Sequence, residues 1–385
     1  MLKNNRQLFV YPPMMALSLY ATFLGLMIPQ LIDTYNLNLK QVGLFSGMQG
    51  VGMIVALILC FCLFSAFNTT RISTIAMFLF ALLMVLVGIN TSITAFYVLF
   101  FFIGISQVTI DTLANTVIRE TSGRNESLWL GLLHSLWAFS GAVGPFLALA
   151  IGGSYKQAFI CLGVYVVVSA VLYVVGLNKW VKAPMMQNKN NFGGLLKLLQ
   201  MFKIKCMPSM VIINVFSCLV QNTYILFIAE YMQQTYSFEL GGAVCLSSIF
   251  FGMLIGRTLF SLFADKIPVL KTMTVSNAVA VVCFAGVFLT NSLVITIVLI
   301  CLGSLLTAMN FPALVLEAHK LAPHDVSSAS SLIYIGLVAS IVFAPPIIGF
   351  IGDAIGLRWA LLITAFGLLP VVALSAVSIK HFDVA

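Results

Sequence analysis

The 385-residue chain is 61% hydrophobic and only 8% charged, and its mean hydropathy is +1.10. Because a soluble protein needs roughly a quarter of its residues charged to cover its surface, this composition excludes a soluble globular fold. The formal net charge of +8 could indicate nucleic-acid binding. Whether it does depends on where the basic residues lie along the chain.

Long apolar runs recur along the whole chain, each near the roughly 20 residues that a lipid-spanning helix needs. In hydrocarbon every backbone amide must be paired internally, which leaves helices or a closed barrel. The runs are continuous, without the alternation of polar and apolar residues typical of barrel strands. We therefore expect an all-α membrane protein with twelve transmembrane helices, at residues 11–32, 38–64, 71–89, 93–119, 127–152, 156–177, 208–235, 240–264, 270–290, 293–320, 326–353 and 357–378.

The basic residues fall mainly on one side of these twelve helices. Alternate loops lie on opposite faces of the membrane, and 16 of the 19 lysines and arginines belong to one face. The other face has only Lys40, Lys156 and Arg358. This positive-inside asymmetry predicts that both termini are cytoplasmic, in a plasma (inner) membrane. It accounts for the net charge without nucleic-acid binding.

The helices divide into two groups of six. A basic cytoplasmic linker at residues 178–207 separates an amino-terminal bundle, residues 1–177, from a carboxy-terminal bundle, residues 208–385. At a constant offset of 200 residues, Gly52 matches Gly252 and Pro145 matches Pro345. Parallel six-helix repeats related by an axis along the membrane normal are a plan used by secondary transporters, so we expect two pseudo-symmetric six-helix bundles.

One acid, Asp111, lies clearly inside a predicted span, the fourth. Ionisable groups inside a bilayer are costly and are functional candidates by default. Gln107 and Asn115 are one turn away on either side, so all three share one helix face. Because desolvation favours the neutral form of a carboxyl group, Asp111 is suited to bind and release a proton during transport. The structural alternative is a buried acid that is only hydrogen-bonded.

Aromatic and amide side chains offer candidate substrate contacts on four other helices. His134 and Trp137 lie on adjacent surface of the fifth helix and would form a wall for a sugar ring, whereas Trp129 also fits an interfacial anchor. The amides could equally tie helices together. The candidates beyond the fifth helix are Asn214, Gln221 and Asn222 in the seventh helix, Asn310 before Pro312 in the tenth, where a kink would free a carbonyl, and Tyr334 in the eleventh.

The end of the eighth helix carries Arg257, Asp265 and Lys266. This cluster is typical of a cytoplasmic hinge that pairs charges between helices, so we expect a gating role. The eight cysteines are scattered without a CxxC pair, which predicts neither a metal site nor a disulfide framework. No nucleophile and base can be placed together, and no phosphate-binding GxxxxGK[ST] loop occurs, so an enzyme is not expected and no cofactor is implied.

Four segments resemble the fucose permease-type branch of the major facilitator superfamily, which includes fucose–proton and glucose/mannose–proton symporters. The resemblance touches both halves and implies the twelve-helix fold of that superfamily. The segments are DTLANTVI (Asp111–Ile118), LGLLHSLWAFSGAVGP (Leu130–Pro145), FFGMLIGRTLFSLFADK (Phe250–Lys266) and FPALVLEA (Phe311–Ala318).

By this resemblance, Asp111 matches the acid of the fourth helix that takes part in proton coupling. His134 falls where a polar residue of the fifth helix lines the sugar cavity. The sequence also departs from the branch: Ile28 stands before Pro29, where fucose permeases have an aspartate, and Phe64–Arg71 lacks the superfamily's usual acid.

We therefore expect a secondary active transporter working by alternating access, with proton-coupled symport of a monosaccharide or similar small polar solute. The expected partners are the substrate, protons and the lipid bilayer. A monomer is one of the oligomeric states that the sequence allows. Two alternatives stay open: proton-driven efflux of drugs or amphipathic compounds on the same fold, and a transport-inactive membrane sensor or partner protein. A cavity rich in amides with a Trp favours sugar, whereas one lined mainly by Phe and Met favours efflux.

Overall fold

A computed structural model describes residues 6–62, 69–122, 126–177, 198–236, 238 and 240–382, and within these ranges it consists of helices joined by turns, without strands. Twelve helical segments of this part of the chain are long and apolar enough to cross a membrane. The all-α prediction and the number of spans are thereby confirmed.

The residues cluster by contact into two compact units. The first comprises Met1–Leu31 and Met48–Gly194, and the second comprises Ile32–Gly47 and Leu195–Ala385. The predicted linker at 178–207 falls mostly on residues outside the described part. Unlike the predicted boundary, the border between the units crosses two continuous helices. It falls between Leu31 and Ile32 in the first helix and between Gly47 and Met48 in the second.

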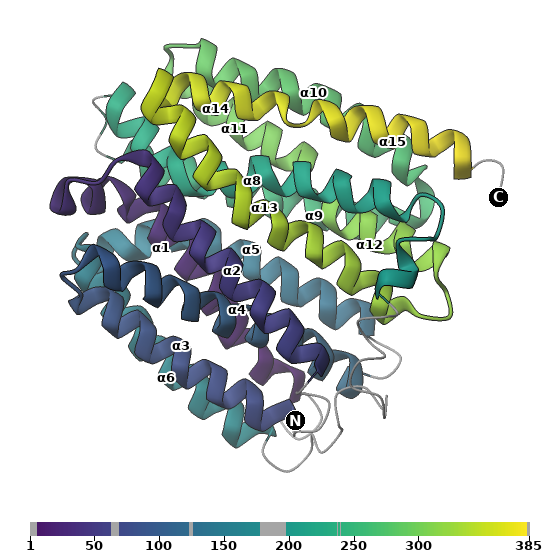
Figure 1. The fold of residues 1–385 in the computed structure, drawn as a ribbon, viewed down its shortest axis with the longest axis horizontal. Helices are drawn as coiled ribbons and strands as arrows, with labels where there is room; N and C mark the ends of the chain where they lie inside the picture. Colours follow the sequence, from purple (N-terminus) through teal and green to yellow (C-terminus); the bar gives the residue numbers. More distant parts are fainter. Residues whose placement is uncertain are drawn as a thin grey trace. The chain divides into compact units, whose positions relative to one another are not determined.

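The helices of the amino-terminal half follow the predicted spans to within a few residues. In this half α3 and α6 pack along each other (Figure 1). The elements are η2 (Arg6–Val10), α1 (Tyr11–Tyr35), α2 (Leu39–Cys62), α3 (Thr69–Ile89), α4 (Ile93–Ser122), α5 (Glu126–Ala150) and α6 (Tyr155–Leu177).

The carboxy-terminal half repeats this series with two interruptions. Helix α9 packs along α11, and α8 packs along α13. The elements are α8 (Met207–Thr235), α9 (Gly241–Phe263), η5 (Ala264–Lys266), α10 (Val269–Leu289), α11 (Leu293–Thr307), α12 (Asn310–Leu321), α13 (Val326–Ile355), α14 (Leu357–Phe366) and α15 (Leu369–Phe382).

Both interruptions have a proline immediately downstream. The tenth span breaks at Ala308–Met309 and the twelfth at Gly367–Leu368, and each new helix has Pro312 or Pro370 in its first turn. Proline lacks an amide hydrogen and is best tolerated in the first turn of a helix. The interruption before Pro312 agrees with the kink expected there, whereas the one before Pro370 was not predicted.

Large side chains fill the inside of each unit, while branched apolar side chains cover the outside. Tyr20 is 1% exposed and meets the rings of Phe80 and Phe159 edge-on, at centroid distances of 5.6 and 6.4 Å. Val175 and Val282, by contrast, are 75% and 71% exposed. Apolar side chains turned outward in this way are suited to contact with lipid.

One helix crossing occurs in both halves at the offset of 200 residues. A Cβ atom at Gly52 would lie 1.9 Å from the carbonyl oxygen of Phe101, and one at Gly252 would lie 2.3 Å from that of Cys301. Helices α2 and α4, and likewise α9 and α11, therefore cross with their backbones in contact. The repeated contact supports the internal repeat inferred from the sequence.

Candidate functional site

A polar stripe follows one face of α4 in the first unit. Gln107, Asp111 and Asn115 are all half-buried there. The Asn115 side-chain amide donates to Oδ1 of Asp111 at 3.1 Å and to its backbone carbonyl at 2.8 Å. The spacing of four residues thus brings the acid and at least one amide together, as predicted from the sequence.

Two residues that the sequence reasoning did not select extend this stripe to other helices. The Gln49 amide in α2 donates to Oε1 of Gln107, and the Tyr20 hydroxyl in α1 donates to Oε1 of Gln49 at 3.0 Å. Gln49 is 6% exposed, so this chain of bonds lies inside the unit. The helix crossing at Gly52 lies one turn after Gln49, and a glycine one turn from a buried amide is the signal that could have identified it.

The aromatic candidates on α5 separate into two groups. His134 and Trp137 are half-buried on this helix, and they remain predicted substrate contacts. Trp129 stacks on the ring of Tyr11 in α1 with a centroid distance of 6.3 Å, and its carbonyl accepts from the Tyr11 hydroxyl at 3.3 Å. Trp129 therefore ties α5 to α1.

Two of the predicted amides on α8 bind the neighbouring helix α13. Asn214, fully buried, donates to the carbonyl of Ile333 at 2.7 Å. Asn222 donates to the hydroxyl of Ser340 at 2.9 Å. These bonds hold α8 against α13, which is the structural role that polar side chains commonly take between membrane helices.

Asn310 forms a reciprocal amide pair with a residue that was not predicted, Asn277 in α10. Each side chain donates to the other at 2.8 Å, and Asn310 also donates to the hydroxyl of Ser217 in α8 at 2.7 Å. Both asparagines are at most 1% exposed. The first residue of α12 is thereby tied to α10 and α8.

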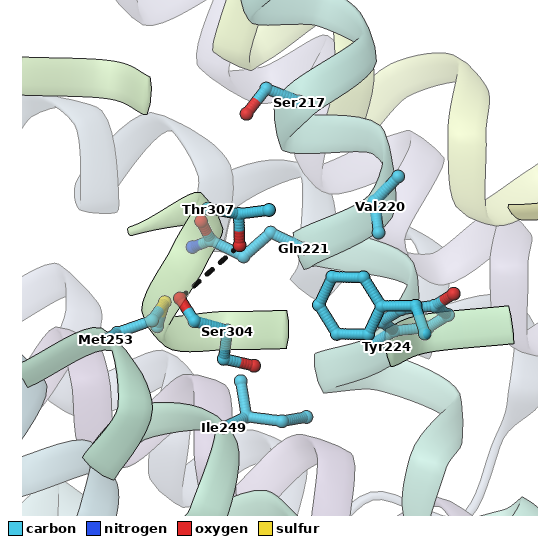
Figure 2. A pocket seen from close by; sticks show the side chains of 9 residues that line it. Ser217, Val220, Gln221, Tyr224, Ile249, Met253, Ser304 and Thr307 are labelled. Carbon is cyan, nitrogen blue, oxygen red and sulfur yellow. Dashed lines mark hydrogen bonds between the residues drawn. The ribbon is translucent and has the colours of Figure 1, made fainter. Parts of the chain in front are cut away.

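A small pocket in the second unit is lined by Gln221, the third of the predicted amides on α8. Figure 2 shows Gln221 from α8 and Thr307 at the end of α11 facing each other, with Ser304 and Met253 beside them. The Thr307 hydroxyl donates to the carbonyl of Ser304 at 3.3 Å. Unlike Asn214 and Asn222, Gln221 lines a cavity, so of the three predicted α8 amides it is the one best placed to reach a ligand.

The last predicted contact, Tyr334 on α13, packs edge-on against Phe311 of α12 at a centroid distance of 6.4 Å. Its ring therefore packs against the residue of α12 that follows Asn310.

Among the described residues no group of three His, Cys, Asp or Glu side chains could hold a metal ion.

The family model described as Major Facilitator Superfamily matches the sequence over residues 14–315 and again over 210–381. The chain belongs to the Major Facilitator Superfamily. No curated protein matches it. As members of this superfamily are transporters, the chain is a secondary active transporter and not an enzyme, and it is a multi-pass integral membrane protein.

Solved structures of other Major Facilitator Superfamily transporters share this fold at low sequence identity. A mutant of the nucleoside transporter NupG superposes with a TM-score of 0.80 at 12% identity, covering 97% of this chain and 99% of that one. A bacterial homologue of the human lysosomal transporter Spinster gives 0.79 at 13%, covering 97% and 96%. A variant of the Escherichia coli fucose:proton symporter FucP gives 0.67 at 16%, covering 96% and 97%. At these low identities the superpositions establish the fold alone. The match of the family model confirms the superfamily that the sequence motifs resemble.

The predicted gating residues of this superfamily member lie in two different settings. Asp265 and Lys266 are exposed in η5. Arg257 is half-buried two turns earlier on α9. A gating role for the three residues stays a prediction.

Removing one member of the amide pair is expected to destabilise the transporter more than removing both. Asn310→Leu leaves the buried Asn277 amide without its partner, which costs about 1–3 kcal/mol. The double replacement with Asn277→Leu leaves no orphaned partner within the pair. Thermal unfolding in detergent measures this, and a double variant less stable than either single variant would contradict a role based on mutual hydrogen bonding.

Proposed function

We propose that the chain carries a monosaccharide or a similar small polar solute together with protons, by alternating access between two six-helix bundles. The observation that carries this proposal is the half-buried Asp111 carboxyl group on the polar face of α4, hydrogen-bonded to Asn115. A carboxyl group within a membrane span that has a bound neutral partner can exist in both protonation states. It can therefore take up a proton on one side of the membrane and release it on the other.

The substrate would meet amide, hydroxyl and aromatic groups, which suit a solute with several hydroxyls. In the second unit we assign this role to Gln221, with Ser304 and Thr307 beside it. In the first unit, Gln107 and Asn115 flank Asp111, and His134 with Trp137 provide the aromatic surface. Asn214, Asn222 and Asn310 fit this role less well, because their donors already bind other helices.

Proton-driven efflux of amphipathic compounds stays the second candidate. Ile249, Met253 and Phe284 line the same pocket as Gln221, and such side chains accept apolar solutes. In either case the excess of basic residues on one set of loops supports cytoplasmic termini in a plasma (inner) membrane.

The proposal is tested by uptake into proteoliposomes with and without an inward proton gradient. The panel contains radiolabelled monosaccharides and nucleosides, the latter because a structurally similar protein is a nucleoside transporter. We expect one monosaccharide to accumulate only when the gradient is present. Protein-free liposomes and a protonophore are the controls, and failure of every sugar to accumulate would reject the sugar proposal and direct attention to efflux.

A further inference from the structure

A backbone carbonyl fixes which way the buried amide pair of α10 and α12 faces. The Asn277 amide nitrogen donates to the carbonyl oxygen of Met273 at 2.7 Å. A carbonyl oxygen can only accept a hydrogen bond, so the nitrogen of Asn277 must lie on this side. It also donates to Oδ1 of Asn310 at 2.8 Å, and Oδ1 of Asn277 accepts from Asn310 at 2.8 Å. The orientation of Asn310 is therefore fixed as well, because the pair is reciprocal.

This orientation determines what the Ser217 hydroxyl in α8 can do. With one hydrogen given to Asn277, the Asn310 amide gives its other hydrogen to Oγ of Ser217 at 2.7 Å. The Ser217 oxygen is thus an acceptor toward Asn310, and the single hydroxyl hydrogen must point elsewhere. Within the part of the chain that the structure describes, no acceptor takes this hydrogen. Accepting from Asn310 also polarises the hydroxyl, which strengthens any bond that it donates.

The Ser217 hydroxyl belongs to the pocket that we assign to the solute. Ser217 is 7% exposed and lines this pocket one turn before Gln221 on the same helix, as Figure 2 shows. Thr307, which lines the same pocket, has the opposite character. Its hydroxyl hydrogen is shared between the carbonyls of Gly303 at 3.0 Å and Ser304 at 3.3 Å, which leaves only its lone pairs for a solute. The pocket therefore offers a donor at Ser217 and an acceptor at Thr307.

We propose that Asn277 and Asn310 are positioning residues that hold the Ser217 hydroxyl as a hydrogen-bond donor to the carried solute. Neither asparagine is among the described residues that line the pocket, so both act through Ser217. The inference rests on the proposed function, since the solute must occupy this pocket. It adds that the solute presents an acceptor oxygen to Ser217 and a hydrogen to Thr307. Sugar hydroxyls do both, whereas a solute with only ether or carbonyl oxygens leaves Thr307 unpaired.

Asn310→Asp tests the orientation, because it replaces the amide nitrogen that faces Ser217 with an oxygen. This oxygen accepts from Ser217 whether the carboxyl group is charged or neutral, since the one hydrogen of the neutral form bonds to Asn277. The Ser217 hydroxyl then donates to position 310 and not to the solute. Ser217→Ala removes the same donor directly, so both variants should weaken binding alike, by about three- to tenfold. Combining them should add little, because both remove one interaction.

The measurement is equilibrium binding of radiolabelled D-glucose, D-mannose, D-galactose and L-fucose to the full chain in detergent, with adenosine and uridine as a second set. Ser340→Ala is the matched control. Ser340 in α13 also accepts from an amide of α8, that of Asn222 at 2.9 Å, but it donates to the Leu337 carbonyl at 2.6 Å. We expect this variant to bind as the parent does. The double replacement of Asn277 and Asn310 with leucine leaves the Ser217 hydroxyl without its orienting donor and should fall between the parent and Ser217→Ala.

A measurement without solute separates this inference from the proposed function. In Ser217→Cys a thiol replaces the hydroxyl, and its S–H stretching band is obtained as the infrared difference from the parent protein. Asn310→Asp should shift this band to lower frequency, because the thiol then donates to the carboxyl group. The shift without binding of any sugar would support the positioning role and reject sugar transport. An identical band with Asn310 and with Asn310→Asp, or unchanged affinity in folded, monodisperse Ser217→Ala for a solute that the parent binds, would overturn the inference.

Discussion

Asp111→Asn is expected to abolish proton-driven accumulation of the substrate while leaving substrate exchange intact. Asparagine has the shape of aspartate and can still accept the hydrogen bond from Asn115, which is 3.1 Å long in the structure. It cannot bind and release a proton, so the gradient no longer drives the transport cycle. The measurement is uptake with an inward proton gradient, compared with counterflow of labelled substrate against unlabelled substrate without a gradient.

Glu230→Gln is the matched comparison for this result. Glu230 is 7% exposed in α8 of the second unit and accepts from the Gln234 amide at 2.7 Å, so the same chemical change is made at a second acid within a membrane-spanning helix. We expect Glu230→Gln to keep gradient-driven accumulation. Accumulation that survives Asp111→Asn but is lost with Glu230→Gln would assign the coupling carboxyl to the second unit.

Gly52→Ala is expected to cause the largest loss of stability of any single methyl addition discussed here. Its Cβ atom would lie 1.9 Å from the Phe101 carbonyl oxygen, and the reciprocal position, Gly104, would place a Cβ atom 1.9 Å from the Gln49 carbonyl oxygen. Both neighbours are backbone atoms, so no change of rotamer can make room and α2 must move away from α4. Overpacking of this kind costs about 1–3 kcal/mol or more, which thermal unfolding in detergent can measure.

Gly131→Ala is the control, because a Cβ atom at this position in α5 meets nothing within 4 Å. Alanine is favoured over glycine inside a helix by about 1 kcal/mol, so this variant should be as stable as the parent or more so. If Gly52→Ala unfolds at the same temperature as Gly131→Ala, the backbone contact between α2 and α4 is not essential for the unit.

The spans were predictable because hydropathy and helix length depend only on local sequence. The grouping of Gln107, Asp111 and Asn115 was predictable for the same reason, since a spacing of four residues fixes them on one face of α4. The break at Pro370 carried the same local signal as the break at Pro312, yet only the latter was recognised.

The rest of the site depends on contacts between distant segments. Gln49 meets Gln107 across 58 residues, and Asn277 meets Asn310 across 33; no periodicity within one helix predicts either pair. Polarity alone also selected Asn214 and Asn222 as substrate contacts, although both donate to α13. A single sequence shows which side chains need a partner inside a membrane, but it does not show whether another helix or a ligand supplies one.

The contacts of α2 also set an order for the assembly of the protein in the membrane. The crossing of α2 with α4 joins Gly52 to a carbonyl 49 residues later. At the start of α2, by contrast, the backbone amides of Leu39 and Lys40 donate to the carboxylate of Asp353 in α13, both at 2.9 Å and more than 300 residues later. Chains are synthesised from the amino terminus, and local contacts form before distant ones. The crossing can therefore form early in synthesis, while the first turns of α2 wait for α13 until the chain is nearly complete. During that interval this helix end is capped by its own residues, because Gln41 N donates to Oδ1 of Asn38 at 2.8 Å and Asn38 N donates to Oε1 of Gln41 at 3.0 Å.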